Sequence, residues 1–491
     1  MNIMPSSYPS LRSAAAILLL ASVSACTTVG PDYQGPPQTA SSAEARGAFL
    51  RAGQAVPDAP VARWWEQLND PLLTRLVDDA ITGSPNIAIA NAKIAQARAG
   101  LAANKTANVP TIGTSVSAPH LNMPNNPFLQ QQGQSDERLD VQQYSLGFDA
   151  SWEIDLFGGT RRKVESASAK AQAAEAGLAD AQVSLSAEVA RAYVGIRARQ
   201  AILAEFEAQK RVDSQLVSLA SQRLTRGTAP EQPLNQVRGQ AAQTDGQIAS
   251  TTAEITVLKD QLALLTGREP GALDADLAAS APIPLPPAQV AIGDPARLLR
   301  NRPDIRIAER QMVAANADVG ATIAEKFPKI SFMGMLGMGG TSVGDMLNPS
   351  NLLGLVLPRI SWNLFDGGRT EAKIDASKGA YAEAEANYRA KVLSALTDAE
   401  NALTRFGSDR VELAKALETE AQAARATELQ RQRARAGTIG TSDALTAERQ
   451  RIQAGMAAIN ARAELTSDYI AVQKALGLGW EAPTISSRKS D

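Results

Sequence analysis

The sequence repeats one unusual phrase, and this repeat limits the folds that are open to the chain. SWEIDLFGGTRRK begins at Ser151, and the similar SWNLFDGGRTEAK begins at Ser361. A long helical stretch and a Gly-Thr turn follow each copy, with the turns at residues 227–228 and 437–438. Because several features recur in one order, we predict a tandem duplication with a Pro-rich joint at residues 282–287.

The residues before each phrase indicate strands. From Tyr144 to Trp152, apolar residues share one face and small or polar residues share the other. A period of two fits a half-buried strand in a soluble sandwich, or a tilted strand that crosses a membrane with its apolar face toward lipid. Four strands are expected, at about residues 109–118, 142–152, 329–339 and 352–362, and Pro358 makes the last of them the weakest.

Four strands cannot close a membrane barrel by themselves. An open sheet edge in lipid would leave backbone groups unsatisfied, so membrane-spanning strands require assembly. Two copies would give eight strands with an interior filled by side chains, whereas three copies would give twelve strands and leave room for a channel. A pore therefore favours a homotrimer.

Two long helices are expected, at residues 160–226 and 369–435, because neither stretch contains proline. A single helix of that length would reach roughly 100 Å, which exceeds the width of a globular domain. The a and d positions of the first four heptads are largely alanine, so neighbouring helices can approach closely. Shorter return helices are expected at residues 233–266 and 442–476. The alternative on periodicity alone is a solvated coiled-coil rod.

The N-terminus indicates secretion. Arg12 precedes an apolar run at residues 14–21 that is too short to span a bilayer, so residues 1–25 are predicted to be a signal peptide. The stretch LASVSAC resembles a bacterial lipobox, in which the thiol of Cys26 is acylated and becomes the mature N-terminus. The alternative is an incidental cysteine after a plain signal peptide. Thr27 stands where an aspartate would, by analogy, retain a lipoprotein in the inner membrane.

Composition and motifs argue against nucleic-acid binding, metal binding and catalysis. A net charge of −2 does not suit a protein that neutralises phosphates. A single cysteine and a single histidine exclude a disulfide framework and nearly exclude a Cys/His metal cage. His120 lies at the start of an expected surface loop, and no G-x-S-x-G, H-E-x-x-H or phosphate-loop motif is present. No enzyme activity, metal or cofactor is expected, apart from a covalent lipid on Cys26.

Several motifs in a fixed order resemble one known family. They are Trp64-Trp65 with Asp70-Pro71-Leu72-Leu73, the segment from Leu298 to Ile305, Phe327-Pro328-Lys329-Ile330, and the two Trp-to-Gly-Gly junctions. The chain resembles a TolC-type outer membrane factor of the NodT/OprM-like lipoprotein branch that serves RND multidrug efflux pumps. The resemblance implies an α+β membrane protein: a TolC-like trimer with a shared 12-stranded outer-membrane β-barrel, four strands per protomer, a long periplasmic α-helical barrel and a mixed equatorial region.

The resemblance and the repeat together suggest the following organisation. Residues 1–25 are the signal peptide, 26–62 a lipid-anchored N-terminal tether and equatorial segment, 63–267 the first repeat, 268–301 an equatorial linker, 302–477 the second repeat and 478–491 a C-terminal tail.

The family also implies roles for the helix tips. The two turns are expected to meet a periplasmic adaptor through Arg226, Gly227, Thr228, Gly437 and Thr438. Asp443 and Thr446 match positions at which family members form a periplasmic aperture, and Thr446 stands where a second aspartate is often found. Alternatively, Asp443 is a first-turn carboxylate of its own helix. The nearby Arg431, Arg433 and Arg435 are expected on a solvated face.

The repeated phrase marks the passage from strand to helix. Trp152 and Trp362 end strands where an aromatic ring suits a membrane–water interface. The glycine pairs Gly158-Gly159 and Gly367-Gly368 would then allow a sharp change of direction. Arg161, Arg162 and Arg369 begin the helices that follow.

The expected function is an outer-membrane exit duct that passively conducts drugs or other small toxic compounds. Its partners would be an inner-membrane RND pump, a periplasmic membrane-fusion adaptor, two further copies of the chain and outer-membrane lipid, with no nucleic acid. One alternative is a TolC-like duct for type I protein or other secretion. A second is a lipid-anchored periplasmic coiled-coil scaffold or adhesin.

Overall fold

The computed structural model describes residues 28–53, 56, 58, 61–123 and 139–480. The chain divides into two compact units; the first takes residues 1–36, 95–172 and 309–386, and the second takes 37–94, 173–308 and 387–491. The expected signal peptide, the lipid site at Cys26 and most of the expected C-terminal tail lie outside the described residues.

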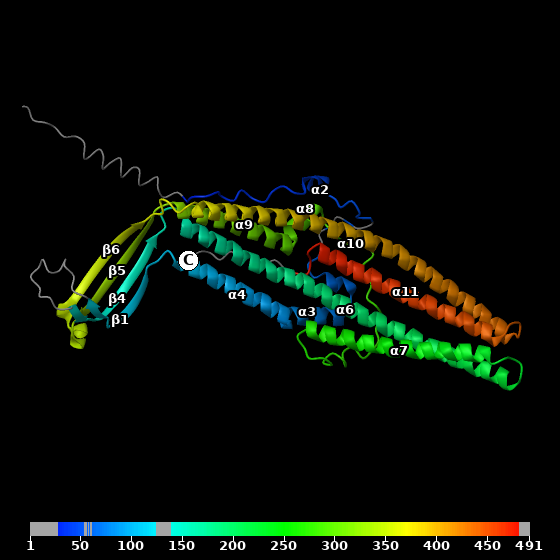
Figure 1. Ribbon diagram of the computed structural model, residues 1–491. Coiled ribbons are helices and arrows are strands. Elements are labelled where there is room, and N and C mark those ends of the chain that lie inside the picture. Colours follow the sequence, from blue (N-terminus) through cyan, green and yellow to red (C-terminus); the bar gives the residue numbers. More distant parts are fainter. Residues whose placement is uncertain (1–27, 54–55, 57, 59–60, 124–138, 481–491) are drawn as a thin grey trace, which may run out of the picture. The chain divides into compact units, whose positions relative to one another are not determined.

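The first unit contains an antiparallel sheet in the order β1-β4-β5-β6 (Figure 1). Its strands are β1 (Thr111–Ser117), β4 (Tyr144–Ile154), β5 (Lys329–Gly340) and β6 (Leu352–Ser361). Each half of the sequence supplies two neighbouring strands, and the halves meet where β4 pairs with β5. Pro358 lies within β6, at an edge of this sheet, where one row of N–H groups has no partner strand.

The sheet exposes apolar side chains along its length. Every residue of β6 is exposed, and Val356 and Ile360 retain 71% and 70% of their accessible surface. Phe148 on β4 and Met333 on β5 are also more than half exposed. The register places Phe148 and Val356 on one face of the sheet and Met333 on the other, so apolar side chains are exposed on both faces. Exposed apolar surface of this kind indicates contact with lipid or with another chain.

The first unit also contains a separate two-stranded sheet and two 3₁₀ helices. β2 (His120–Met123) pairs with β3 (Leu139–Gln142), and Gln143 separates β3 from β4. One strand was expected over residues 142–152, so the break at Gln143 is a difference from the sequence pattern. There, the Gln143 N–H donates to the Pro119 carbonyl at 3.0 Å. The link between β5 and β6 contains η3 (Val343–Leu347) and η4 (Pro349–Asn351).

Two uninterrupted helices of 67 residues each, α6 (Gly159–Thr225) and α10 (Arg369–Arg435), contribute to both units. The returning helices are α7 (Gln232–Leu265) and α11 (Thr441–Ala475). Two shorter helices, α4 (Pro85–Thr106) and α9 (Pro303–Ile323), precede the strands, and η2 (Ala324–Lys326) extends α9. Among the described residues, none of the helices combines the length and the apolar character that crossing a bilayer requires.

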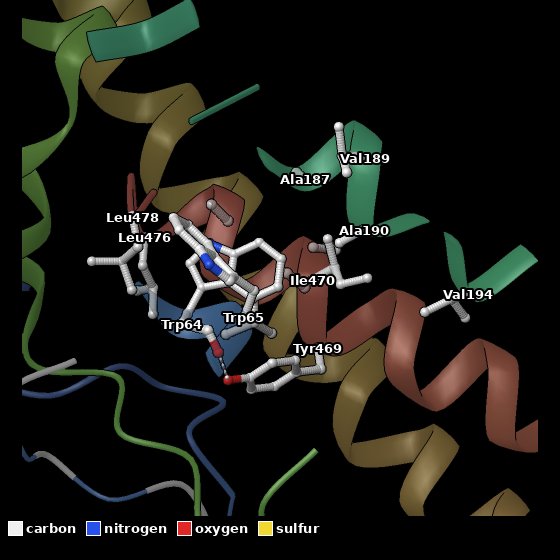
Figure 2. Packing of buried hydrophobic residues seen from close by; sticks show 14 of the residues in the cluster. Trp64, Trp65, Ala187, Val189, Ala190, Val194, Tyr469, Ile470, Leu476 and Leu478 are labelled. Carbon is white, nitrogen blue, oxygen red and sulfur yellow. Dashed lines mark hydrogen bonds between the residues drawn. The ribbon is translucent and has the colours of Figure 1, made fainter. Parts of the chain in front are cut away.

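The core of the second unit forms around an aromatic cluster (Figure 2). Trp64 in η1 (Trp64–Leu68) contacts both Trp65 and Tyr469 edge-on, with ring centroids 5.7 and 6.0 Å apart. The Tyr469 hydroxyl, on α11, lies 2.9 Å from the Gln67 Oε1 atom and 3.3 Å from the Trp64 carbonyl. The double-tryptophan motif therefore packs the N-terminal part of this unit against α11.

The aspartate that follows this motif serves two purposes. Asp70 caps α3 (Pro71–Gly83) by accepting the N–H groups of Leu72 and Leu73, at 3.0 and 3.1 Å. Its second oxygen accepts the hydroxyl of Tyr193 on α6 at 2.5 Å. Burial and this carboxylate raise the pKa of Tyr193 to about 12, so Tyr193 remains a hydrogen-bond donor.

The expected equatorial segments meet within the second unit. Val56 forms a parallel bridge with Ala291: its N–H donates to Val290 O, and its carbonyl accepts the Ile292 N–H, both at 3.0 Å. Two short helices, α2 (Ser41–Arg46) and α8 (Pro295–Asn301), belong to the same segments and contact one another.

Candidate functional sites at the strand-to-helix junctions and the helix tips

The two tryptophans of the repeated phrase make the same contact. The indole N–H of Trp152 donates to the Asn108 carbonyl at 3.1 Å, and that of Trp362 donates to the Lys326 carbonyl at 2.9 Å. Both carbonyls lie just before a strand, at the end of the preceding helical segment. The rings remain partly exposed while their only polar atom is satisfied, which suits a side chain at an apolar–water boundary.

The glycines of the junctions differ in conformation. Gly158, Gly367 and Gly368 have φ values of 80°, 68° and 87°, in the left-handed region that favours glycine. Gly159 does not, because it is already the first residue of α6. Glycine is favoured at this position because there is little room for a side chain: a Cβ atom on Gly159 would lie 3.1 Å from the Cβ atom of Ala324.

Two aspartates at the junctions make contacts that the repeated sequence pattern does not predict. Asp155 accepts the backbone N–H of Arg161 at 2.8 Å. Asp366 accepts those of Gly368 and Thr370 at 3.0 and 2.9 Å. These bonds satisfy N–H groups that the first turn of a helix leaves without partners. Hydrogen bonds from Thr370 lower the pKa of Asp366, so it stays charged beside the positive end of α10.

A signal for these aspartates exists in the sequence but is easily overlooked. Each copy of the phrase has one aspartate shortly before its glycine pair, yet Asp155 stands three residues before Gly158 and Asp366 stands directly before Gly367. Aligning the two copies therefore does not bring the aspartates together.

The two helix tips share one turn geometry. Gly227 and Gly437 have φ values of 68° and 70°. After them, the backbone N–H and the hydroxyl of Thr228 both donate to Arg223 O, and those of Thr438 both donate to Arg433 O. A glycine that ends a helix in this conformation satisfies its last carbonyls. The chain thus turns twice in the same way, and Arg226 is exposed at the first turn.

The expected aperture residues are exposed near the start of α11. Asp443 accepts the Gly440 N–H at 3.2 Å, so it does act as a first-turn carboxylate. Thr446 donates its hydroxyl to the Ser442 carbonyl at 2.9 Å within the helix. Both residues are exposed in the single chain.

A buried polar network joins α11 to α6 and α7. Asp213 on α6 is almost fully buried and lies 3.3 Å from the Arg449 guanidinium of α11. It also accepts the Thr244 hydroxyl of α7 at 2.7 Å and the Gln209 amide at 3.1 Å. Arg449 donates further to Gln240 of α7 at 2.6 Å. Because burying a charge is costly unless it is paired, this network selects one arrangement of the three helices.

A second network joins α10, α11 and α6. Arg431 donates to Glu448 at 2.6 Å, and Arg451 contacts the same carboxylate at 3.0 Å and Glu205 at 3.4 Å. Arg431 remains exposed, as expected, but it also pairs with Glu448, which is largely buried. Arg433 and Arg435 are exposed.

Neither network could be read from local patterns. Both depend on residues in sequence-distant helices, and within each helix these residues resemble ordinary solvent-facing charges. The only signal is a polar side chain on a seam that is otherwise apolar, as at Asp213.

Carboxyl groups also meet between α10 and α11. Burial, followed by the facing carboxylate of Asp468 on α11, raises the pKa of Asp409 on α10 to about 6. Glu464 and Glu412 act in the same direction, while Arg405 contacts Asp468 at 3.5 Å.

The only histidine of the chain does not form a chemical centre. His120 lies on β2, not in a loop, and its ring is more than half exposed beside Asp140 and Gln142. Within the described parts of the chain, no group of three or more histidine, cysteine or acidic side chains could hold a metal ion.

The chain matches a family model described as "Outer membrane efflux protein" over residues 76–268 and 295–478. It is 28% identical over 458 residues to a solvent efflux pump outer membrane protein of Pseudomonas putida, covering 92% of this chain and 95% of the relative. It is 27% identical over 382 residues to nodulation protein T of Rhizobium leguminosarum bv. trifolii, covering 76% and 78%.

Solved structures show the same fold. The outer-membrane channel OprN is 31% identical, with a TM-score of 0.82, covering 91% of this chain and 98% of that one. The open state of the Neisseria gonorrhoeae MtrE outer membrane channel is 23% identical, with a TM-score of 0.76, covering 92% and 98%. The second likeness is one of fold alone.

Gly367→Ala should destabilise the protein by about 1–2 kcal/mol, because alanine strains the left-handed conformation even where space is free. Gly379→Ala is the matched control, since Gly379 lies inside α10 with nothing within 4 Å of an added Cβ. Alanine there should be neutral or stabilising by up to about 1 kcal/mol. The check is the midpoint of thermal helix loss by circular dichroism; equal shifts for both variants would contradict the assignment.

Asp409→Asn should stabilise the protein at neutral pH and have less effect near pH 4. The folded state raises the pKa of Asp409 to about 6 from an unfolded value of about 3.9, so the folded state holds the proton more tightly. Stability from this group is present below about pH 4 and is lost as pH rises through 6. Thermal melts from pH 4 to 8 test this, with the exposed Asp375→Asn as control. A variant whose advantage does not grow with pH would argue against it.

Proposed function

Because the chain belongs to the outer membrane efflux protein family, we propose that it is the exit duct of a tripartite efflux system. It would passively conduct drugs or other small toxic compounds from an inner-membrane pump and a periplasmic adaptor to the cell exterior. The observation that carries this proposal is the twofold passage from an apolar sheet into an uninterrupted helix of 67 residues. That architecture supports conduction across a membrane and a periplasmic space.

The sheet supports assembly into a trimer. Its edges, β1 and β6, each have one row of backbone groups without a partner strand in the single chain. Pairing β6 of one copy with β1 of the next would satisfy them, and three copies would give a closed barrel of twelve strands. The face of the sheet that carries Phe148, Val356 and Ile360 would then face lipid.

The cargo class is supported by the relatives. Relatives of similar length are named for solvent efflux, toluene efflux and pyoverdine export. These names describe small organic compounds, so we propose small organic cargo for this chain as well. Export of a protein remains the alternative, but no structural observation favours it.

The N-terminus supports an outer-membrane lipoprotein. Cys26 ends a lipobox-like stretch, and a relative in Salmonella typhimurium is named a probable outer membrane lipoprotein. We therefore propose acylation of Cys26 after removal of residues 1–25.

The two polar networks support a restrained aperture. Asp443 and Arg449 lie less than two turns apart on α11, and Arg449 is bound to α6 and α7. Movement of Asp443 away from a trimer axis would therefore require the contacts of Arg449 to break or shift. We propose that this network holds the aperture narrow until a partner engages the helix tips.

Deleting the gene should raise the susceptibility of the cells to organic solvents or antibiotics. The tagged protein should capture an adaptor and an inner-membrane pump after cross-linking, because an exit duct alone has no energy source. Susceptibility that is restored by the wild-type gene is the control. Capture of a protein-secretion ATPase in place of the pump would support the alternative duct. A protein that forms no heat-sensitive trimer and conducts no current would refute the duct altogether.

Asp443→Ala should raise pore conductance or weaken block by cations in planar bilayers, because it removes one negative charge per copy from the proposed aperture. Arg449→Met should raise conductance by a different route, since it frees α11 from Asp213. Thr446→Ala is the matched control for a small change at the same surface, and only a slight effect is expected. Currents unchanged in both Asp443→Ala and Arg449→Met would refute the proposed aperture.

A further inference from the structure

The residues that follow the lipid site do not form a free tether. Residues 28–32 lie along the first strand-to-helix junction, within the first unit. The Val29 N–H donates to the Phe157 carbonyl at 3.0 Å, and the buried Asn316 of α9 donates its side-chain amide to the Pro31 carbonyl at 3.0 Å. The first described residues of the tether and equatorial segment expected over residues 26–62 are therefore held by hydrogen bonds.

A single arginine makes three further hydrogen bonds to this segment. Arg162, in the first turn of α6, has only 4% of its side chain exposed. Its Nε and Nη2 atoms donate to the carbonyls of Val29 and Gly30, both at 3.2 Å, and Nη2 also donates to the Asp32 carboxylate at 2.7 Å. Nη1 donates to Glu165 at 2.8 Å. The planar fork of arginine suits several fixed acceptors at once, which lysine cannot match.

Two glycines allow the N-terminal segment to approach this closely. Gly30, with φ of 91°, lies against the backbone of Gly320 in α9, and a Cβ atom on Gly30 would collide with it. Gly158 lies against Thr28, whose Cα would be 2.8 Å from a Cβ atom added there. The segment therefore fits a shaped surface in addition to being hydrogen-bonded.

We propose that Arg162, with residues 28–32, forms a clamp that fixes the lipid anchor beside the strand-to-helix junction. The proposal rests on acylation of Cys26, which belongs to the proposed function. Cys26 is two residues before Thr28, so its backbone lies within about 7 Å of Thr28 at full extension. The acyl chains would enter the membrane next to the sheet, near the interfacial rings of Trp152 and Trp362.

The clamp makes the anchor a positioning device. A released segment of about ten residues would let the anchor range over roughly 15–20 Å. With the clamp closed, the acyl chains on Cys26 and the adjoining end of the sheet would meet the membrane at the same depth. The junction would therefore lie at the inner leaflet of the outer membrane. Arg162 is thus a positioning residue that acts through the N-terminal segment.

The segment can be observed directly with a spin label. Once Cys26 is acylated, Gln34→Cys supplies the only free thiol, at an exposed position two residues beyond Asp32. In the full-length trimer in liposomes, this label should be ordered. Arg162→Gln should raise its mobility, whereas the neighbouring exposed Lys163→Gln should not, and Arg162→Lys should restore order only in part.

A second variant guards against misfolding of the first. Gly30→Ala changes only the N-terminal segment, so it should release the label even if Arg162→Gln fails to give a heat-sensitive trimer. If the label is equally mobile in the unchanged chain, in Gly30→Ala and in Arg162→Gln, the clamp does not exist.

Photo-crosslinking tests the position of the lipid. Cells fed a diazirine fatty acid should yield crosslinks from the acylated N-terminus to peptides of β4, β5 or the junction, and Arg162→Gln should reduce them at least fivefold. Mass spectrometry of the N-terminal peptide separates the two proposals. An unacylated Cys26 refutes the anchor in the proposed function and with it this placement, whereas an acylated Cys26 with crosslinks unchanged by Arg162→Gln or Gly30→Ala refutes the clamp alone.

Discussion

The need to keep backbone hydrogen bonds satisfied governs this protein where each strand becomes a helix. At that point the ladder of the sheet ends and the first N–H groups of a helix have no internal partner. Asp155 and Asp366 supply acceptors for those groups. Trp152 and Trp362 supply donors to carbonyls left at the ends of the preceding helical segments. The repeated phrase is conserved within the chain because both crossings face the same problem.

Much of the architecture followed from the sequence because it depends on local patterns. The long helices were expected at residues 160–226 and 369–435, and they occur at Gly159–Thr225 and Arg369–Arg435. Proline-free, alanine-rich stretches with glycine turns define such boundaries well. The family resemblance and the channel fold are confirmed by the family match and by the OprN structure.

The features that the sequence concealed all depend on distant partners. Arg162 was expected only to begin a helix, yet it is buried against residues 29–32. Asp213 and Arg449 pair across more than two hundred residues, and Arg431 finds Glu448 on another helix. A charged residue that is buried by a remote segment has the same local context as one in water. Buried pairs of this kind add little net stability, but removing one partner is costly, so they act chiefly to fix one arrangement.

The equal lengths of α6 and α10 have a consequence for how such a gene can change. Both helices contain 67 residues, although few positions are identical between them. One inserted codon would rotate every residue beyond it by about 100° and would turn the seam away from its neighbours. Substitutions disturb one position, whereas an insertion disturbs all that follow. The two halves of the gene could therefore diverge in amino-acid identity while the lengths of their helices stayed fixed. The number of residues between the turns is preserved better than the residues themselves.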